Sequence, residues 1–325
     1  MSGPSDGIAA HPLPLSARAP GKCILFGEHA VVHGAPELLF AIDLDTQMSV
    51  RPAESSSLNG DPAAAVTHPY LRAALERCWT ADVPLHVRAV SRIPKAAGLG
   101  SSAAFVAALG AVLAAARGGI ARSELAQRSF DVERGAQGVG SPGDTSASVA
   151  GGYITINSGS ADLLWEVSDG LQRWAVRRAS DPGWTWVIAY SGIPRSTADA
   201  VRAVGTRLAQ ADGPELLEKF RRVAEAGIRA VASEDRIGTA TAMNENHELL
   251  VEAGVSHPRL EELIRAAAPA ALASKLTGAG AGGSIVTMPV PGKEAECVRR
   301  LARAGGLAFA VRPARHGAGL LSSGG

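Results

Sequence analysis

The chain has 325 residues and a formal net charge of +1, with 46% hydrophobic and 19% charged residues. This length allows two ordinary domains with a sizeable core, and the balanced charge gives no electrostatic basis for binding nucleic acid or an acidic membrane surface. Cys23, Cys78 and Cys297 are far apart and form no C-x-x-C pair. They argue against a disulfide framework or a zinc site and favour a reducing, cytoplasmic environment.

The first half of the chain mixes strand and helix patterns. Residues 1–14 lack the basic start and apolar run of a signal peptide, so we expect a disordered leader there. Residues 96–116 carry no charge and are long enough to cross a membrane, but alanine and glycine dominate them, which favours a buried core helix. Hydrophobic patterns predict strands at 23–26, 38–44, 47–52, 85–90 and 153–157, and helices from Ser101 and from Ser123.

A glycine loop precedes the first predicted helix. Residues 94–104 read Pro-Lys-Ala-Ala-Gly-Leu-Gly-Ser-Ser-Ala-Ala, and Gly98 and Gly100 would let the backbone approach an anion at the positive end of the helix. A dinucleotide fingerprint is disfavoured because the acidic residue it needs about 20 residues later is missing, and the Walker A pattern is absent. The loop alone is compatible with a phosphate cradle or with a plain turn before a buried helix.

The second half follows the turn-forming residues Ser180-Asp-Pro-Gly183, which we take as the domain boundary. Mixed order without regular βαβ repetition indicates an α+β protein of two domains. The expected strands are 184–190, 271–276, 284–288 and 307–311, and the expected helices are 215–232, 239–252, 258–267 and 293–304.

Three ordered motifs resemble those of the GHMP small-molecule kinases, and more narrowly of the mevalonate kinases. Residues 19–34, Ala-Pro-Gly-Lys-Cys-Ile-Leu-Phe-Gly-Glu-His-Ala-Val-Val-His-Gly, look like the first motif, the glycine loop like the second, and residues 274–283 like the third. Residues 193–197 and 244–250 are similar to mevalonate kinase segments, and Gly-x-x-Ser-Pro-x-Asp-Thr at 138–145 looks closest to archaeal members.

The resemblance implies the two-domain GHMP kinase fold, with an N-terminal domain at 15–182, a C-terminal domain at 183–325 and the active site in the cleft between them. It also implies ATP- and Mg²⁺-dependent phosphorylation of (R)-mevalonate to mevalonate 5-phosphate by a cytoplasmic enzyme, with a homodimer as the suggested assembly. Two alternatives stay open: another GHMP kinase, acting on phosphomevalonate, homoserine or a sugar, and a non-catalytic nucleotide-binding sensor.

A buried carboxylate is expected in the helix that follows the glycine loop. Glu133 shares a helical stripe with Leu125, Ala126, Ser129 and Phe130, and a buried carboxylate needs a cation. The resemblance makes Ser102 and Glu133 ligands of Mg²⁺. The alternative is an exposed glutamate paired with Arg128 or Arg134. The resemblance assigns the nucleotide to Ser91, Ala96, Ala97, Gly98, Leu99, Gly100, Ser101 and Ser102.

Asp144 and Lys22 carry the catalytic roles that the resemblance implies. Asp144 stands 11 residues after Glu133 in a loop rich in glycine, where local rules alone would make it an N-cap. The matching aspartate of mevalonate kinases takes the proton of the attacking hydroxyl. Lys22 would lie beside it and keep it ionised, whereas an ordinary strand-edge lysine is the alternative.

The resemblance assigns the acceptor to residues from three segments, although the last of these, 277–283, could equally be a plain hairpin turn. We expect His247 to be structural. Two departures from the family pattern stand out: Ala96 replaces a usual glycine, which costs little unless its φ is positive, and Glu37-Leu-Leu-Phe40 replaces small apolar residues and is expected to alter the pocket rim or nucleotide affinity. The assigned acceptor residues are Glu28, His29, Arg195, Thr197, Thr277, Gly278 and Gly280.

Overall fold

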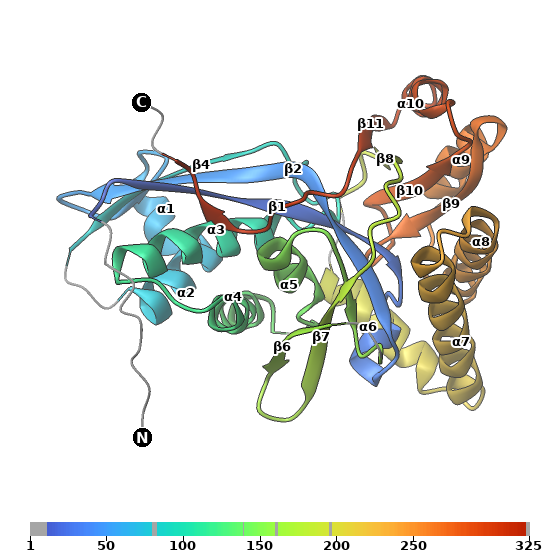
Figure 1. Ribbon diagram of the computed structural model, residues 1–325, viewed down its shortest axis with the longest axis horizontal. Helices are drawn as coiled ribbons and strands as arrows, with labels where there is room; N and C mark the ends of the chain where they lie inside the picture. The colour runs from blue at the N-terminus through green and yellow to red at the C-terminus, as the bar shows by residue number, and fades with distance from the viewer. Residues whose placement is uncertain (1–11, 80–82, 139, 160–161, 195–196, 323–325) are drawn as a thin grey trace.

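The computed structural model describes residues 12–79, 83–138, 140–159, 162–194 and 197–322. Two sheets lie side by side, each with its own helices (Figure 1). Among the described residues the larger sheet has the order β12-β1-β2-β5-β7-β6, with β4 paired to β2 and β3 to β4. Its strands are β1 (Leu15–Phe26), β2 (Glu37–Pro52), β3 (Ser57–Leu58), β4 (Leu85–Ser91), β5 (Tyr153–Ile156), β6 (Leu163–Ser168), β7 (Arg173–Ala179) and β12 (Gly319–Leu320).

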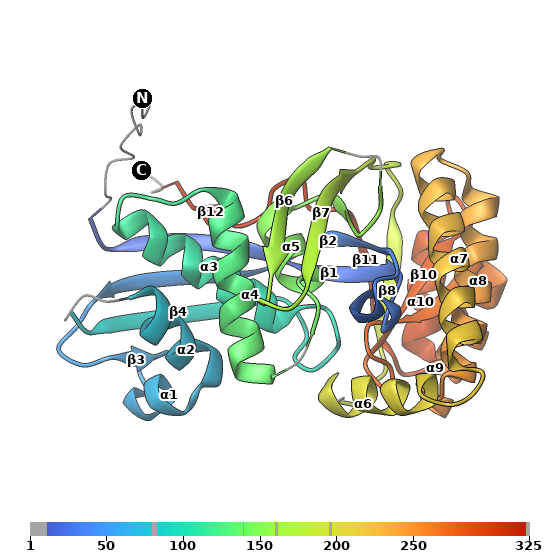
Figure 2. The same cartoon turned by 90° about the horizontal axis from the view of Figure 1, so that it is seen from below.

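Helices pack on the larger sheet, with α3 and α4 crossing one face of it (Figure 2). Most of α3 is buried, which confirms a core helix and explains why it is apolar all round. No helix in the described part of the chain is both long and apolar enough to cross a membrane. The helices of this part are α1 (Pro62–Thr67), α2 (Pro69–Cys78), α3 (Ser101–Ala116), α4 (Arg122–Gln137) and α5 (Gly143–Ala150).

The smaller sheet is antiparallel, with the order β11-β8-β10-β9. Long amphipathic helices cover it, and their apolar faces form a second buried cluster around Phe220, Leu250 and Leu263. The strands are β8 (Trp186–Tyr190), β9 (Ala271–Thr277), β10 (Ser284–Pro289) and β11 (Leu307–Val311). The helices are α6 (Thr197–Leu208), α7 (Gly213–Ala232), α8 (Arg236–Glu252), α9 (Pro258–Ala267) and α10 (Glu294–Arg303), with short 3-10 turns η1 (Ala30–His33) and η2 (Ala268–Ala270).

The strongly patterned elements are confirmed, and the differences have physical reasons. The strands predicted at 38–44 and 47–52 are one strand, β2, and β1 begins eight residues before the predicted strand because a bulge between Pro20 and Lys22 absorbs the proline and glycine. The predicted loop before Ser146 is helical from Gly143 onward. The elements that were not predicted are α1, α2, α6, β3, β6, β7 and β12.

The assignment of residues 183–325 to one C-terminal domain needs correction. After β11 the chain returns to the larger sheet, where the Ala314 amide donates to the Ala41 carbonyl at 2.8 Å and β12 pairs with β1 through Ala17 and Leu320. Gly317 makes this return possible, because a Cβ there would lie 2.0 Å from the carbonyl oxygen of Val149. Residues 312–321 therefore belong to the N-terminal body.

Candidate active site

A cavity of about 820 Å³ lies where the N-terminal body, built on the larger sheet, meets the second body, built on the smaller sheet. Its walls come from β1, β2, the glycine loop, α3, α4 and the start of α5, and Gly278 and Ala279 of the second body complete it. This volume is in the range of small-molecule sites. Every residue predicted to bind the nucleotide lines it, together with Lys22, Glu28, His29, Glu133, Asp144 and Gly278.

The glycine loop is pressed against β1. The Lys22 amide donates to the Leu99 carbonyl at 2.9 Å, and the Ser284 hydroxyl of β10 donates to the Ala97 carbonyl at 2.8 Å. Gly100 is left-handed, and a Cβ on it would lie 2.8 Å from Cγ of Lys22. The loop therefore needs glycine at residue 100 and presents its backbone, followed by the first amides of α3, to the cavity.

Ala96 adopts the conformation that makes its replacement of glycine costly. Its φ is +55°, in the left-handed region where a Cβ crowds the following carbonyl. The alanine that replaces the usual glycine of the family is therefore strained, and it stands at the start of the glycine loop.

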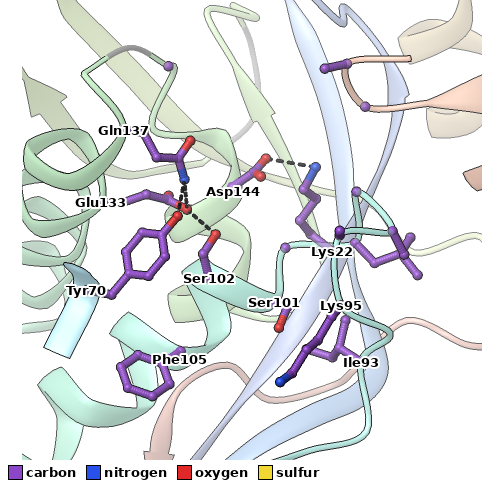
Figure 3. Close-up of a pocket in the computed structure, with 18 of the residues that line it drawn as sticks. Lys22, Tyr70, Ile93, Lys95, Ser101, Ser102, Phe105, Glu133, Gln137 and Asp144 are labelled. Atoms are coloured by element: carbon purple, nitrogen blue, oxygen red, sulfur yellow. Dashed lines mark hydrogen bonds and ion pairs between the residues drawn. The ribbon is translucent and has the colours of Figure 1, made fainter. Parts of the chain in front are cut away.

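Ser102 and Glu133 meet in the cavity. The Ser102 hydroxyl donates to Glu133 Oε1 at 2.7 Å, and Gln137 Nε2 donates to the same oxygen at 3.1 Å and to the Tyr70 hydroxyl at 3.1 Å (Figure 3). Burial, followed by the negative charge of Asp144, raises the pKa of Glu133 to about 7. The alternative arginine partners are engaged elsewhere, since Arg134 pairs with Asp169 and Arg128 with Glu124.

The donors at Glu133 fit Mg²⁺. Hydroxyl and carboxylate oxygens are the hard ligands this ion prefers, and it normally shares few protein ligands with substrate phosphates. In the described part of the chain no group of three or more histidine, cysteine and acidic side chains could hold a metal by itself. A site of one carboxylate and one hydroxyl, completed by phosphate oxygens, suits this arrangement.

Lys22 and Asp144 form an ion pair, with Nζ and Oδ1 3.0 Å apart. Lys22 is buried, whereas the Asp144 side chain is 33% exposed, and the two side chains point toward each other in Figure 3. Asp144 lies in the first turn of α5 and does not cap it, because Pro142 occupies the N-cap. Its carboxylate therefore stands at the positive end of the helix dipole.

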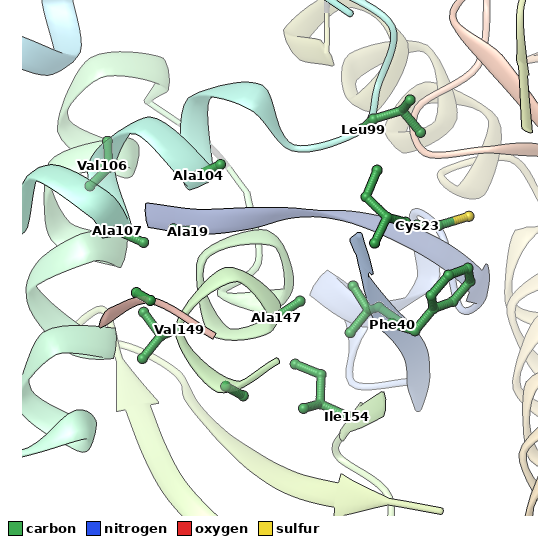
Figure 4. Close-up of a cluster of buried hydrophobic side chains, with 14 of the residues drawn as sticks. Ala19, Cys23, Phe40, Leu99, Ala104, Val106, Ala107, Ala147, Val149 and Ile154 are labelled. Atoms are coloured by element: carbon green, nitrogen blue, oxygen red, sulfur yellow. The ribbon is translucent and has the colours of Figure 1, made fainter. Parts of the chain in front are cut away.

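The helix α5 is held firmly at its other end. Ala147 and Val149 pack into the buried cluster that also contains Ile154 (Figure 4). Arg122 donates to the Val149 carbonyl at 3.0 Å, and Arg178 donates to the carbonyls of residues 150 and 151. These contacts satisfy the last carbonyls of the helix and fix the position of Asp144.

Glu28 and His29 follow β1 at a tight turn. Glu28 is buried, and its Oε1 accepts a hydrogen bond from Lys275 Nζ of β9. His29 has a φ of +62°, and its Nε2 lies 3.1 Å from the Ala279 carbonyl. Both residues line the cavity, so the first motif and the second glycine-rich loop meet there.

The acceptor residues predicted in the second body are only partly brought to the cavity. Gly278 lines it, but Thr277 does not: its hydroxyl donates to the Ile24 carbonyl at 2.9 Å and accepts from the Ile24 amide at 3.1 Å, which ties β9 to β1. Gly280 packs against Val255, since a Cβ there would lie 2.2 Å from that carbonyl oxygen. Arg195 lies outside the described residues, and Thr197 is described only as the first residue of α6.

Three residues near the site were not predicted. Gln137 stands four residues after Glu133 on α4, so helical spacing was a usable signal. Tyr70 comes from α2, an element that the sequence pattern did not predict, and Lys275 reaches Glu28 across 247 residues of chain, so neither had a local signal. His247 is structural as expected, because its ring contacts Glu261 of α9 and the Leu276 amide of β9.

Family profiles match both parts of the chain: GHMP kinases N terminal domain matches residues 65–152, and GHMP kinases C terminal matches residues 228–306. The chain belongs to the GHMP kinase family. The mevalonate kinase of Pyrococcus abyssi is 32% identical to it over 339 aligned residues, which cover 93% of this chain and 96% of that protein.

Solved structures share the fold. The L. major mevalonate kinase in complex with R-mevalonate has a TM-score of 0.76 at 21% identity. The superposition covers 94% of this chain and 99% of the L. major chain. The Lactococcus lactis galactokinase complexed with galactose has a TM-score of 0.71 at 19% identity, covering 94% and 95%. Because kinases named for different acceptors share this fold, the fold alone does not select the acceptor.

Proposed function

We propose that this protein is an ATP-dependent mevalonate kinase, which transfers the γ-phosphoryl group of ATP to the 5-hydroxyl of (R)-mevalonate. The observation that carries this is the Lys22–Asp144 ion pair, which stands in one cavity with a glycine loop suited to phosphates and with the Gly-Glu-His segment of the first motif. The similarity to curated mevalonate kinases over nearly the whole chain supports mevalonate as the acceptor.

The glycine loop and α3 bind the triphosphate. Backbone amides at the start of α3 meet the phosphate oxygens, where the dipole of this 16-residue helix favours negative charge. Ser102 and Glu133 hold Mg²⁺. When bound, this ion neutralises charge on the phosphate oxygens as it builds up during transfer.

Asp144 is the base. Its carboxylate takes the proton of the acceptor hydroxyl, the freed oxygen bonds to the γ-phosphorus, and the bond from that phosphorus to the bridging oxygen of ADP breaks. Lys22 holds Asp144 in place through their ion pair and stabilises negative charge on the attacking oxygen during the transfer.

Glu28, His29 and Gly278 shape the acceptor pocket, and by the family resemblance Arg195 and Thr197 face the substrate carboxylate or the γ-phosphate. We also infer a cytoplasmic location, from the three widely spaced cysteines, and a homodimer, from the resemblance. Contacts to nucleic acid or membrane form no part of the proposal, because the net charge of +1 offers no basis for them.

The test is ADP release by the purified protein with Mg-ATP, measured in one coupled assay with mevalonate, phosphomevalonate, homoserine, galactose or no acceptor. We expect turnover with mevalonate alone, at about 1 to 10³ per second. Activity on another acceptor only would overturn the acceptor assignment and keep the phosphate site. Silence with all acceptors would favour a nucleotide-binding sensor.

A further inference from the structure

Glu37 places an additional carboxyl in the cavity wall. It is the first residue of β2, its side chain is 2% exposed, and it lines the cavity. A Cβ added to Gly143, the first residue of α5, would lie 2.5 Å from Glu37 Oε2. The carboxyl therefore packs against the turn of α5 that carries Asp144, and glycine at residue 143 leaves room for it.

The buried lysines Lys22 and Lys275 are each committed to another carboxylate. Lys22 pairs with Asp144, and Lys275 pairs with Glu28. No lysine or arginine in the described part of the chain forms an ion pair with Glu37. A buried carboxyl that lacks a cation favours its neutral form.

The surroundings of Glu37 raise its pKa on balance. Burial, then the charge of Asp144 on α5, and to a smaller extent that of Glu28 on the turn after β1, raise the pKa of Glu37 well above its usual value. Lys22 of β1 and the Ser141 hydroxyl oppose this only in part. The register partner on β5, Ile156, is apolar. Burial without a cationic partner therefore favours the protonated form of Glu37.

One oxygen of this carboxyl has no partner. Within the residues that the structure describes, nothing lies within hydrogen-bonding distance of Glu37 Oε2, although the atom is buried. Buried polar atoms in folded proteins are nearly always hydrogen-bonded to protein, water or ligand. This oxygen faces Gly143, whereas the Glu37 residue as a whole lines the cavity beside the proposed base. A turn of the carboxyl toward a bound acceptor would give the oxygen the partner it lacks.

We propose that Glu37 is a specificity-determining residue of the acceptor pocket, which as a neutral acid donates a hydrogen bond to an oxygen of the bound acceptor. This rests on the proposed function, because a hydroxy acid such as mevalonate brings both the oxygen and a negative charge. The neutral acid can donate a hydrogen bond to such a ligand. The ionised form would have no proton to donate and would repel the substrate carboxylate.

The sign of the pH effect follows. As pH rises through the pKa of Glu37, the proton leaves and the KM for mevalonate rises, approaching about tenfold per pH unit. The KM for ATP does not respond to the ionisation of Glu37, because Ser102, Glu133 and the glycine loop bind the nucleotide. Any pH dependence that Glu133 gives to the KM for ATP, through its pKa of about 7, is shared by the parent and by Glu37→Gln. Below that pKa the KM for mevalonate is independent of Glu37 ionisation.

The experiment compares Glu37→Gln and Glu37→Ala with the parent in steady-state kinetics between about pH 6 and pH 10. Glutamine keeps a hydrogen-bond donor and cannot ionise. It should therefore leave the KM for mevalonate at neutral pH within roughly 3-fold of the parent value and abolish the rise of this KM at alkaline pH. Alanine should raise the KM for mevalonate roughly 3- to 10-fold, the effect of one lost hydrogen bond, with kcat and the KM for ATP nearly unchanged. Glu166→Gln on β6, which is exposed and paired with Arg173, controls for the substitution itself.

An alkaline rise that survives in Glu37→Gln overturns the assignment, and so does an unchanged KM in Glu37→Ala. If the alanine variant does not fold, the pH profile of Glu37→Gln decides alone. A parent enzyme that fails to turn over mevalonate overturns the proposed function first, and the assignment with it. If the parent turns over mevalonate and both variants show the same KM and pH profile as the parent, only the Glu37 assignment is overturned.

Discussion

Two lysine–carboxylate pairs border the cavity of this molecule and differ in their exposure to solvent. Lys22 and Asp144 are 3.0 Å apart, and one-third of the Asp144 side chain is exposed to the cavity. Lys275 and Glu28 are both buried, with exposed fractions of 0% and 1%. A ligand can reach the Lys22–Asp144 pair, which we call the open pair, and exchange a proton with it. The Lys275–Glu28 pair, which we call the sealed pair, joins β9 to the turn after β1 and fixes the wall of the pocket.

Breaking the open pair should produce the largest effect on turnover. Asp144→Asn removes the base, and we expect kcat to fall by about 10² to 10⁴ with little change in ATP affinity. Steady-state kinetics and an ATP titration measure both quantities. Near-normal turnover of this variant would contradict the role of Asp144 and the contrast between the pairs.

Breaking the sealed pair should instead reduce stability. Lys275→Met leaves the Glu28 carboxylate buried without its cation, and we expect the free energy of unfolding to fall by about 3–5 kcal/mol. Lys22→Met should cost less stability, because water reaches the exposed part of Asp144. Urea unfolding followed by tryptophan fluorescence measures both variants.

A double variant separates lost attraction from an uncompensated charge. Glu28→Gln combined with Lys275→Met removes both charges, so it should recover most of the stability lost in Lys275→Met. A double variant as unstable as Lys275→Met, or equal losses in Lys22→Met and Lys275→Met, would show that burial does not distinguish the pairs.

The sequence predicted the open pair better than the sealed one. The family resemblance placed Lys22 beside Asp144, and Glu133 was found because α4 repeats apolar residues at helical spacing. Lys275 and Glu28 are 247 residues apart, and nothing local to either residue signals the other. The sealed pair is a product of tertiary structure.

The same reason explains two of the missed elements, α5 and β12. The helix α5 consists of small residues, Gly-Asp-Thr-Ser-Ala-Ser-Val-Ala, without an apolar stripe, and it is held by burial and by arginines that bind its last carbonyls. The strand β12 has two residues, too few for any period. Patterns of 2 or 3.6 residues reveal elements with one buried face, so fully buried or very short elements escape them.

The smallest expected effect concerns the loop that covers the open pair. In Ala96→Gly the left-handed Cβ strain of about 1–2 kcal/mol is relieved, while the added freedom of the unfolded chain costs roughly 0.5–1 kcal/mol. We therefore expect a gain of between zero and about 1.5 kcal/mol in unfolding free energy and a KM for ATP within about twofold of the parent. Gly100→Ala in the same loop is the matched opposite, because its Cβ would lie 2.8 Å from Lys22 Cγ and should lower kcat by about tenfold or more. If Ala96→Gly instead destabilised the protein by more than about 1 kcal/mol, the Ala96 side chain would be contributing packing that outweighs its strain, and the loop would depend on this alanine to hold Lys22 in place.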